Sequence, residues 1–261
     1  MEQAILADKA AGLNPWLIVA AAGTTNTGSV DPLLEIGQIA AGHGLWFHVD
    51  GVYGAFFCLC PEGEEALSGM ERSDSIVMDP HKTLFLPYGS CAVLVKDGGK
   101  LYASQNFAGA YMQDIPDDIA ELSPAELSPE LTKHFRGLRL WLPLKLFGLA
   151  PFRAALSEKI LLARYFHDKI SQAGGFEAGP YPDLSVVTYR YLPERGDAGA
   201  FNQRLIQAIQ KDGRIFISST QIDGNFILRL AIGSFRTHLD DIDQALDVLK
   251  WTARRLVEDG S

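Results

Sequence analysis

Two short apolar runs decide the fold of this chain: LWFHVD at residues 45–50 and DSIVMDPHK at residues 74–82. Apolar runs of this length are typical of strands that are buried on both faces of a parallel sheet. Asp50 then falls at the carboxyl end of the first strand, and Lys82 lies in the loop just beyond the second. Open α/β sheets bind ligands at that end, so we expect both side chains to face the same crevice.

An amine and a carboxylate placed in this way suit one kind of cofactor. A lysine that is partly desolvated or lies beside other cations can lose its proton and attack an aldehyde to form a Schiff base. An aspartate can hold a pyridine nitrogen protonated, and the protonated ring then stabilises a carbanion at the α-carbon of the substrate. Lys82 and Asp50 are therefore the pair that pyridoxal phosphate chemistry requires.

Four ordered blocks of sequence carry a family resemblance: AGTTNTGSVDP at 22–32, HVDGVY at 48–53, DSIVMDPHK at 74–82 and FRGLRLW at 135–141. In these blocks the chain resembles the pyridoxal-phosphate-dependent amino-acid decarboxylases of the aromatic-amino-acid, tyrosine and glutamate decarboxylase group. The resemblance implies an α/β fold of the fold-type I transferase kind, with a parallel-sheet domain followed by a small α+β domain. It also implies decarboxylation of an L-amino acid to the amine and carbon dioxide, with a weak preference for aromatic substrates.

The same resemblance assigns roles to individual residues. It implies that Lys82 is the internal aldimine lysine, and hence the catalytic residue, and that Asp50 is the partner of the pyridine nitrogen. Thr25 would contact the cofactor, and His81 would sit beside the Schiff base and the phosphate end.

Two further cofactor-binding positions depart from the family pattern. Val52 stands where the family usually has alanine beneath the ring, so its extra methyl groups would crowd the cofactor slightly. Asp79 stands near the phosphate, where animal members often have asparagine. A second negative charge there is unfavourable unless only the backbone of Asp79 faces the anion.

Each of these residues also has an ordinary structural interpretation. Lys82 alone would be a solvated surface lysine, and Asp50 alone would be a turn former or helix cap at the end of a strand. His48 shares a strand face with Asp50, because side chains alternate along a strand. It either supports Asp50 or is a core histidine whose hydrogen bonds are satisfied elsewhere.

Other motifs are excluded by their spacing. Residues 23–28 lack both the Walker lysine and the dinucleotide glycine spacing, so we interpret them as a strand-to-helix turn. Cys58 and Cys60 are close in sequence, but Cys91 is distant from both. No second close pair of cysteines and no histidine cluster completes a zinc site. We therefore expect no metal and interpret the cysteines as small buried apolar residues.

The chain resembles a C-terminal half, because the family's serine-rich phosphate turn and ring-stacking histidine would precede it. A parallel sheet that lacks neighbouring strands leaves apolar surface exposed. We therefore expect either a homodimer or pairing with a missing N-terminal half. An incomplete record or a degraded gene is the remaining alternative.

A second departure concerns residues 114–130, which contain three prolines but no tyrosine and are expected to form a long mobile loop or lid. Aromatic decarboxylases carry on this loop a tyrosine thought to protonate the carbanion. Its absence keeps open transamination or aldehyde formation with the same cofactor. A third interpretation is that the chain is a catalytically incomplete remnant or a partner subunit. Tyr111 lies before the loop, and we interpret it as an aromatic residue of the substrate pocket or of an interface.

Composition excludes several other classes of protein. The 261 residues are 47% hydrophobic, which is typical of a globular chain with a sizeable core, and the net charge is −9. That charge disfavours nucleic acid and anionic membranes as partners. No apolar run approaches the roughly 20 residues that span a bilayer, and the odd cysteine count and acidic amino terminus predict a cytoplasmic protein.

Alternation of apolar patterns predicts three parts of the chain. Residues 1–130 would complete the cofactor-binding domain, with a helix at 1–12, strands at 16–22, 45–50 and 74–79, a helix at 32–42 and an antiparallel strand at 90–96. Residues 131–173 would be two linking helices, at 131–148 and 151–172. Residues 174–261 would form a small α+β domain from strands at 184–192, 214–220 and 225–232 and helices at 198–212 and 239–257. Its Arg229 and Arg236 are either structural or meet a substrate carboxylate, the structural role being favoured.

Overall fold

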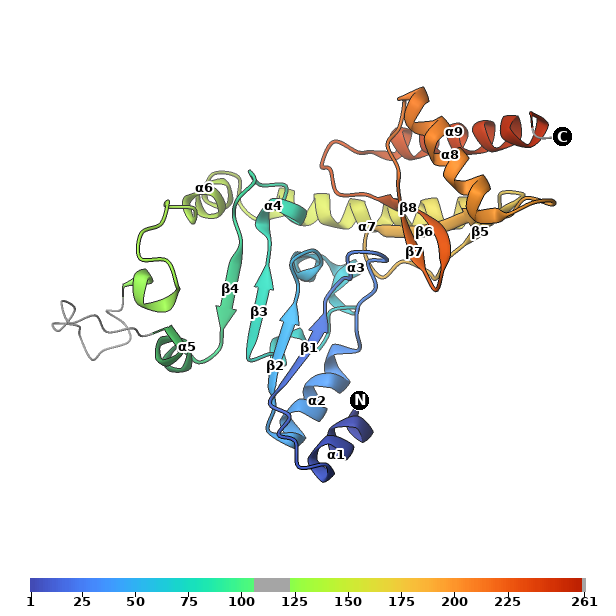
Figure 1. The fold of residues 1–261 in the computed structure, drawn as a ribbon. Helices are drawn as coiled ribbons and strands as arrows, with labels where there is room; N and C mark the ends of the chain where they lie inside the picture. The colour runs from blue at the N-terminus through green and yellow to red at the C-terminus, as the bar shows by residue number, and fades with distance from the viewer. Residues whose placement is uncertain (106–122, 260–261) are drawn as a thin grey trace.

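The computed structural model describes residues 1–105 and 123–259, which form two sheets and a long helix that packs against both (Figure 1). The first sheet contains β1 (Leu17–Ala21), β2 (Trp46–Asp50), β3 (Ser75–Met78) and β4 (Ala92–Val95) in that spatial order. The first three strands are parallel, and β4 runs antiparallel to β3. The α/β class and the reversed fourth strand predicted from sequence are therefore confirmed.

The register of the parallel strands fixes where their ends lie. Ala21 is opposite Asp50 on β2, and Asp50 is in turn opposite Val77 on β3. The carboxyl ends of β1, β2 and β3 consequently meet at one edge of the sheet, which faces the second sheet (Figure 1). We call this edge the carboxyl edge and define it by Thr25, Asp50, Val52, Asp79, His81 and Lys82, which follow the three strands or end them.

Short helices and turns connect these strands. Helix α2 packs on β1 and β2 and ends at Gly44, whose left-handed backbone (φ +67°) a glycine adopts without strain. The connecting helices of this half are α1 (Glu2–Ala10), α2 (Leu33–His43), η1 (Ala55–Leu59), α3 (Pro61–Glu64), η2 (Met70–Arg72), α4 (Pro80–Thr83) and α5 (Gly98–Gln105).

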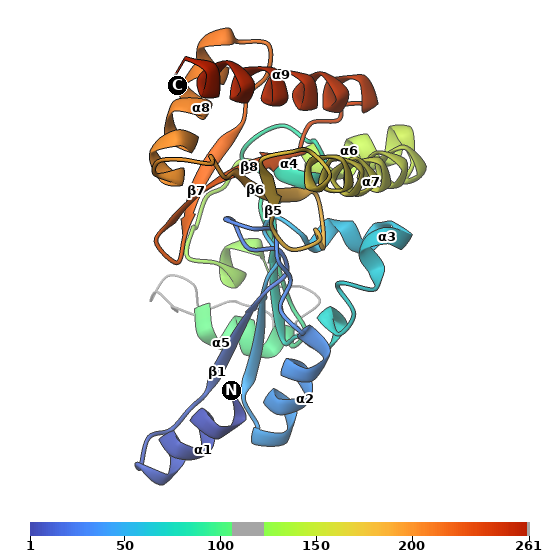
Figure 2. The same cartoon turned by 90° about the vertical axis from the view of Figure 1, so that its right-hand side faces the viewer.

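The second sheet is entirely antiparallel, with spatial order β5-β6-β8-β7. Its strands are β5 (Phe176–Ala178), β6 (Val186–Tyr191), β7 (Ser218–Ile222) and β8 (Asn225–Ala231). Helices α8 (Ala198–Asp212) and α9 (Leu239–Glu258) pack against each other, and α8 also packs on β6 and β8. Figure 2 shows them at the opposite end of the molecule from α1 and α2.

Helix α7 (Ala150–Ser171) belongs to both hydrophobic cores. Its first half places Leu156 and Ile160 in the core of the first sheet, together with Phe47 and Phe57. Its second half contributes apolar residues, among them Phe166, to the core of the second sheet. Helix α6 (Leu138–Phe147) precedes α7, and none of its residues is buried.

Several predicted bounds differ from the structure. Helix α6 begins at Leu138 rather than at residue 131, β7 begins at Ser218 rather than at 214, and β5 was not predicted. Most of the predicted loop at 114–130 and Tyr111 lie outside the described residues, but its end contains a 3₁₀ helix, η4 (Pro124–Leu127). A capping box between Ser123 and Glu126 stabilises that helix. The division at 130/131 and 173/174 stays a prediction.

None of the helices in residues 1–105 and 123–259 is both long and apolar enough to cross a membrane.

Candidate active site

Lys82 lies in the short helix α4, not in a loop as the sequence predicted. Pro80 occupies the first turn of this helix, where a fixed φ and a missing N–H favour helix initiation. The Lys82 side chain is 42% exposed, and its Nζ lies 3.3 Å from Oδ2 of Asp79. The amine is therefore accessible from solvent while one carboxylate holds it in place.

Asp79 lies between the Lys82 ammonium group and the His81 ring. Its Oδ2 is also 3.8 Å from Nε2 of His81, and the Asp79 side chain is largely buried. The His81 Nδ1–H donates to the Ser90 carbonyl at 2.5 Å, and the ring meets Tyr88 edge to face. Asp79 thus directs its carboxylate towards Lys82 and His81, and its place near a phosphate stays a prediction.

The Cys91 thiol is a further neighbour of Asp79. Partial burial and a hydrogen bond to Asp79 raise the pKa of Cys91 to about 11. The interpretation of the cysteines as buried residues is correct for Cys60 and wrong for Cys58 and Cys91, which are exposed. The sequence contains no signal for the Cys91 contact, because this contact forms only once the turn from His81 to Ser90 has folded.

Asp50 ends β2 with its carboxylate exposed to solvent. Within the described chain it accepts one hydrogen bond, from the backbone N–H of Val52 at 3.2 Å. Since this bond uses only Oδ1, the other oxygen is available to a ligand. The His48 side chain bonds instead to the Ser75 hydroxyl at 2.7 Å, so it is a satisfied strand histidine rather than a partner of Asp50.

Close backbone packing positions the turn after Asp50. A Cβ atom on Gly54 would lie 2.1 Å from the Ala22 carbonyl oxygen, so only glycine allows this turn to approach the end of β1. The preceding Tyr53 is partly buried, and its hydroxyl lies 2.7 Å from Oγ of Ser185 and accepts the Ser185 N–H at 3.0 Å. Burial raises the pKa of Tyr53 to about 12.

Thr25 lies in the turn after β1, and its carbonyl accepts a hydrogen bond from Nη2 of Arg229 at 2.5 Å. Burial lowers the pKa of Arg229, and its Nε has no hydrogen-bond partner among the described residues. The contact ties β8 to the carboxyl edge, as a structural role for Arg229 requires. Arg236 is exposed, with its guanidinium 5.3 Å from the ring centre of Phe235.

The structure thus brings Asp79, His81 and Lys82 into contact and places Asp50 and Thr25 at the same edge through neighbouring strands. Asp50 shares no hydrogen bond or ion pair with Lys82 in the described residues. An accessible amine and a carboxylate with a free oxygen form a donor set that fits pyridoxal phosphate. The described residues contain no group of three or more His, Cys, Asp or Glu that would hold a metal.

Comparison with known proteins gives the family. Residues 1–192 match the model of the pyridoxal-dependent decarboxylase conserved domain. The chain is 34% identical to tyrosine decarboxylase 2 of Arabidopsis thaliana over 96% of its own length and 47% of that relative. It is 31% identical to a phenylacetaldehyde synthase of Arabidopsis thaliana, over 98% of this chain and 53% of the relative.

A solved structure shows the same fold. The Oryza sativa TDC crystallised with PLP and tryptamine superposes with a TM-score of 0.89 at 29% identity, covering 98% of this chain and 54% of the other. The chain spans about half the length of the curated relatives it matches. The fold-type I architecture predicted from the four sequence blocks is therefore confirmed, and the chain belongs to the pyridoxal-dependent decarboxylase family.

Proposed function

We propose that this chain supplies the lysine-bearing part of a pyridoxal-phosphate enzyme that decarboxylates an L-amino acid to the amine and carbon dioxide. The observation that carries the proposal is the placement of Asp50 and Lys82 at the carboxyl ends of two neighbouring parallel strands. Membership of the decarboxylase family supports the reaction class.

Each residue of the carboxyl edge has a role in this proposal. Lys82 would bond covalently to the aldehyde carbon of the cofactor through its amine, and Asp50 would hold a proton at the pyridine nitrogen. His81, fixed by the Ser90 carbonyl, would lie beside the Lys82 bond, and Thr25 would contact the cofactor from the end of β1. When bound, pyridoxal phosphate supplies a ring that takes up the electrons of the bond that breaks.

Asp79 and Val52 have supporting roles. The Asp79 carboxylate, 3.3 Å from Nζ of Lys82, would hold the amine at the edge before the cofactor arrives. Its contacts with Lys82 and His81 leave the Asp79 backbone as the part that would face the phosphate. Val52 would lie beneath the ring, where its branched side chain narrows the space that alanine leaves in other members.

Aromatic amino acids are the substrates we favour. The two relatives described above are named for tyrosine decarboxylation and phenylacetaldehyde synthesis, and the solved neighbour was crystallised with tryptamine. All three names describe aromatic compounds. The shared fold and the identity of about a third support the same substrate class here, and a panel of amino acids assayed for carbon dioxide release tests it.

Aldehyde formation is a second candidate outcome with the same cofactor. Residues 114–130 contain no tyrosine, and a phenylacetaldehyde synthase matches 98% of the chain. A site without an acid that returns a proton to the substrate carbon would favour oxidative loss of the amine. Product analysis separates the two outcomes, because decarboxylation yields an amine, whereas aldehyde formation also releases ammonia and consumes oxygen.

We infer that the active form is a dimeric assembly that contains this chain together with the part equivalent to the rest of its relatives, in the same or in another polypeptide. The chain covers 47% of the length of its tyrosine decarboxylase relative, and helix α6 leaves Trp141 and Phe147 largely exposed. Large apolar side chains exposed along one helix are typical of an interface with a partner. The free thiols of Cys58 and Cys91 suit a reducing compartment, which supports a cytoplasmic location.

The experiment that tests the proposal is covalent trapping on the purified chain. Pyridoxal phosphate is added, the mixture is reduced with borohydride, and peptide mass spectrometry locates the pyridoxyl group. We expect near-stoichiometric labelling of Lys82 and its loss in Lys82→Ala. Lys96→Ala is the matched control, because Lys96 is an exposed lysine directly after β4 and belongs to no part of the carboxyl edge.

Labelling scattered equally over exposed lysines would contradict the assignment of Lys82 in this chain. The same trapping repeated after mixing with the remaining half of a relative separates a wrong lysine from an incomplete site. Selective labelling of Lys82 that appears only in the mixture supports both the assignment and the paired assembly.

A further inference from the structure

A second lysine, Lys159, is completely buried where the two hydrophobic cores meet. On helix α7 its neighbours Leu156 and Ile160 belong to the core of the first sheet, whereas Leu162 and Ala163 belong to the core of the second. Burying an ammonium group costs several kcal/mol unless acceptors compensate for the lost water. The contacts of Lys159 must therefore be well formed in the folded protein.

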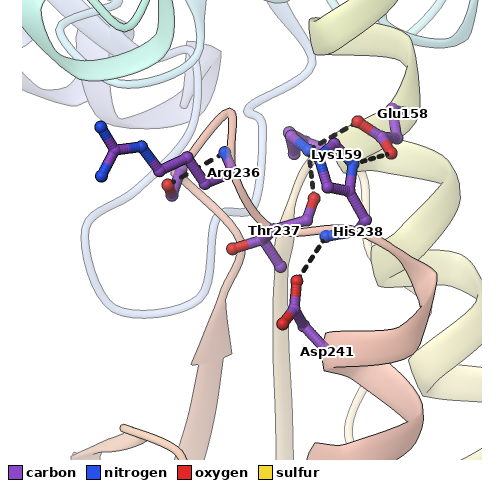
Figure 3. A network of polar contacts seen from close by, with 7 residues as sticks. Glu158, Lys159, Arg236, Thr237, His238 and Asp241 are labelled. Atoms are coloured by element: carbon purple, nitrogen blue, oxygen red, sulfur yellow. Dashed lines mark hydrogen bonds and ion pairs between the residues drawn. The ribbon is translucent and has the colours of Figure 1, made fainter.

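Figure 3 shows these contacts at the chain segment before helix α9. The Lys159 Nζ donates to the Thr237 carbonyl at 2.5 Å and to Oε2 of Glu158 at 2.7 Å. The other oxygen of Glu158 accepts from Nδ1 of His238 at 2.7 Å. Lysine and glutamate together hold two consecutive residues, Thr237 and His238, against helix α7.

The segment they hold, residues 232–238, is anchored at its start by Ile232, which is buried and donates its N–H to the Ser185 carbonyl at 2.9 Å, and has few other anchors. It is irregular, links β8 to α9, and is exposed at most positions. Its internal bonds are local, such as the Thr237 N–H to the Ser234 carbonyl at 3.2 Å. The Arg236 guanidinium points away from the network in Figure 3. Because segments with few buried contacts open easily, the position of this one depends on Lys159 and Glu158.

Phe235 in this segment reaches the chain that follows Lys82. Its ring lies 6.2 Å from that of Phe85 in an edge-to-face arrangement. Phe85 has a left-handed backbone (φ +58°), a conformation that costs a residue other than glycine about 1 kcal/mol or more. Packing must therefore hold Phe85 in this conformation. Phe235, which follows the last strand of the second sheet in sequence, supplies part of that packing.

We propose that Lys159 is a positioning residue for Lys82. By fixing the Thr237 carbonyl, it holds Phe235 against Phe85, and Phe85 fixes the backbone directly after helix α4. The buried lysine at the junction of the cores is thereby linked to the exposed lysine at the carboxyl edge through one aromatic pair.

The consequence for Lys82 chemistry rests on the proposed function, but the structural link does not. The link is measured in the cofactor-free chain, so its failure is distinguishable from a failure of covalent trapping. Two backbone amides report directly on the chain around Lys82. The Lys82 N–H donates to the Asp79 backbone carbonyl at 3.0 Å, and the Leu86 N–H donates to the Pro80 carbonyl at 3.3 Å.

Hydrogen exchange of these two amides, followed in three variants, tests the proposal. Phe235→Ala removes the aromatic pair without touching Lys159, and Lys159→Met removes the donor to Thr237 while keeping the volume of the side chain. Phe216→Ala is the control, because Phe216 is another largely exposed aromatic residue of the second half. An edge-to-face pair worth about 0.5–1.5 kcal/mol corresponds to exchange faster by about 2- to 12-fold.

We expect both amides to exchange faster in Phe235→Ala and Lys159→Met, with no change in Phe216→Ala. The pyridoxal phosphate labelling of Lys82 relative to Lys96 should fall in the same two variants. If the two amides exchange in Phe235→Ala at the same rate as in the control, the proposal is overturned. The Phe235→Ala result remains a valid test even if Lys159→Met does not fold. A folded Lys159→Met with unchanged exchange overturns it as well.

Discussion

Lys82 and Lys159 each lie beside a carboxylate, yet their surroundings are opposite. The Lys82 side chain is 42% exposed and has one ion pair, with Asp79 at 3.3 Å. The Lys159 side chain is 1% exposed, and Glu158 and a backbone carbonyl hold its ammonium. An exposed amine on a short helix is accessible to an incoming aldehyde, whereas a buried amine between two cores is inaccessible and stabilises the folded structure.

Both lysines have a neighbouring carboxylate, so burial is what distinguishes the accessible amine of Lys82 from the structural amine of Lys159. Only a few contacts hold the side chains of the carboxyl edge, and a ligand can replace them. By contrast, the Lys159–Glu158 and Tyr53–Ser185 hydrogen bonds join side chains that are buried or partly buried in the fold. Substitutions in the two regions should therefore separate stability from reactivity.

The largest expected effect on stability is that of Lys159→Ala. It leaves a cavity between the cores and removes the donor to Thr237, so the free energy of unfolding should fall by about 3 kcal/mol. Lys82→Ala removes one partly exposed ion pair and should lower it by no more than about 1 kcal/mol. Urea denaturation of both variants measures the contrast. Equal losses would break the comparison between the two lysines.

Tyr53→Phe should have an intermediate effect. It leaves the Ser185 N–H without its acceptor and should reduce the free energy of unfolding by about 1.5 kcal/mol at pH 8. Because burial raises the pKa of Tyr53 from about 10 to about 12, its stabilisation is fully present below pH 10 and is lost as the pH rises through 12. The stability difference between wild type and variant should therefore shrink above pH 10.

Absorbance titration gives an independent check of that prediction. The ionisation that disappears from the tyrosine titration in Tyr53→Phe should be centred near pH 12. A missing ionisation near pH 10 would mean that the hydroxyl is solvated and that Tyr53 does not join the two halves as described.

The smallest expected effect is that of Glu158→Gln. Burial alone would raise the pKa of Glu158, but hydrogen bonds from His238 and Lys159 outweigh it and lower the pKa below its ordinary value of 4.5. Its stabilisation is therefore present above pH 4.5 and is lost as the pH falls through the lower folded value. The side chain is partly exposed, so the loss at pH 7 should not exceed about 1 kcal/mol.

Urea denaturation at pH 7 and at pH 3 measures this effect. The difference between wild type and Glu158→Gln should narrow at the lower pH. Glu194→Gln, at an exposed position, is the control and should change neither value. A difference that does not depend on pH would show that the carboxylate charge of Glu158 is unimportant at the junction.

The sequence predicted the fold best where local signals and core packing agree. Helix α8 has the predicted bounds because Asp197 caps its first turn, with a hydrogen bond to the Ala200 N–H at 2.7 Å, and Gly213 ends it in a left-handed conformation. Residues 131–137 were wrongly included in α6. They are exposed, and the helix begins only after Gly137. The two apolar side chains of this stretch, Leu131 and Phe135, are both largely exposed, so no core packing stabilises a further helical turn there.

The site was predictable as far as strand ends are predictable. Asp50 and Lys82 could be placed at one edge because parallel strands align their carboxyl ends. The contacts that hold this edge could not be predicted. Arg229 and Phe235 reach it from distant parts of the chain, and Cys91 reaches Asp79 only through the turn that follows His81. Lys159 gave no signal either, because one lysine in an amphipathic helix is normally a solvated residue.

One continuous helix, α7, contributes side chains to both cores. Neither sheet can lose its packing without exposing part of a helix that the other needs, so heat should melt both together in a single calorimetric transition. The ratio of van't Hoff to calorimetric enthalpy would then be close to one. For evolution the same helix acts as a constraint, because neither sheet can be exchanged for a module from another protein unless the replacement also fits α7.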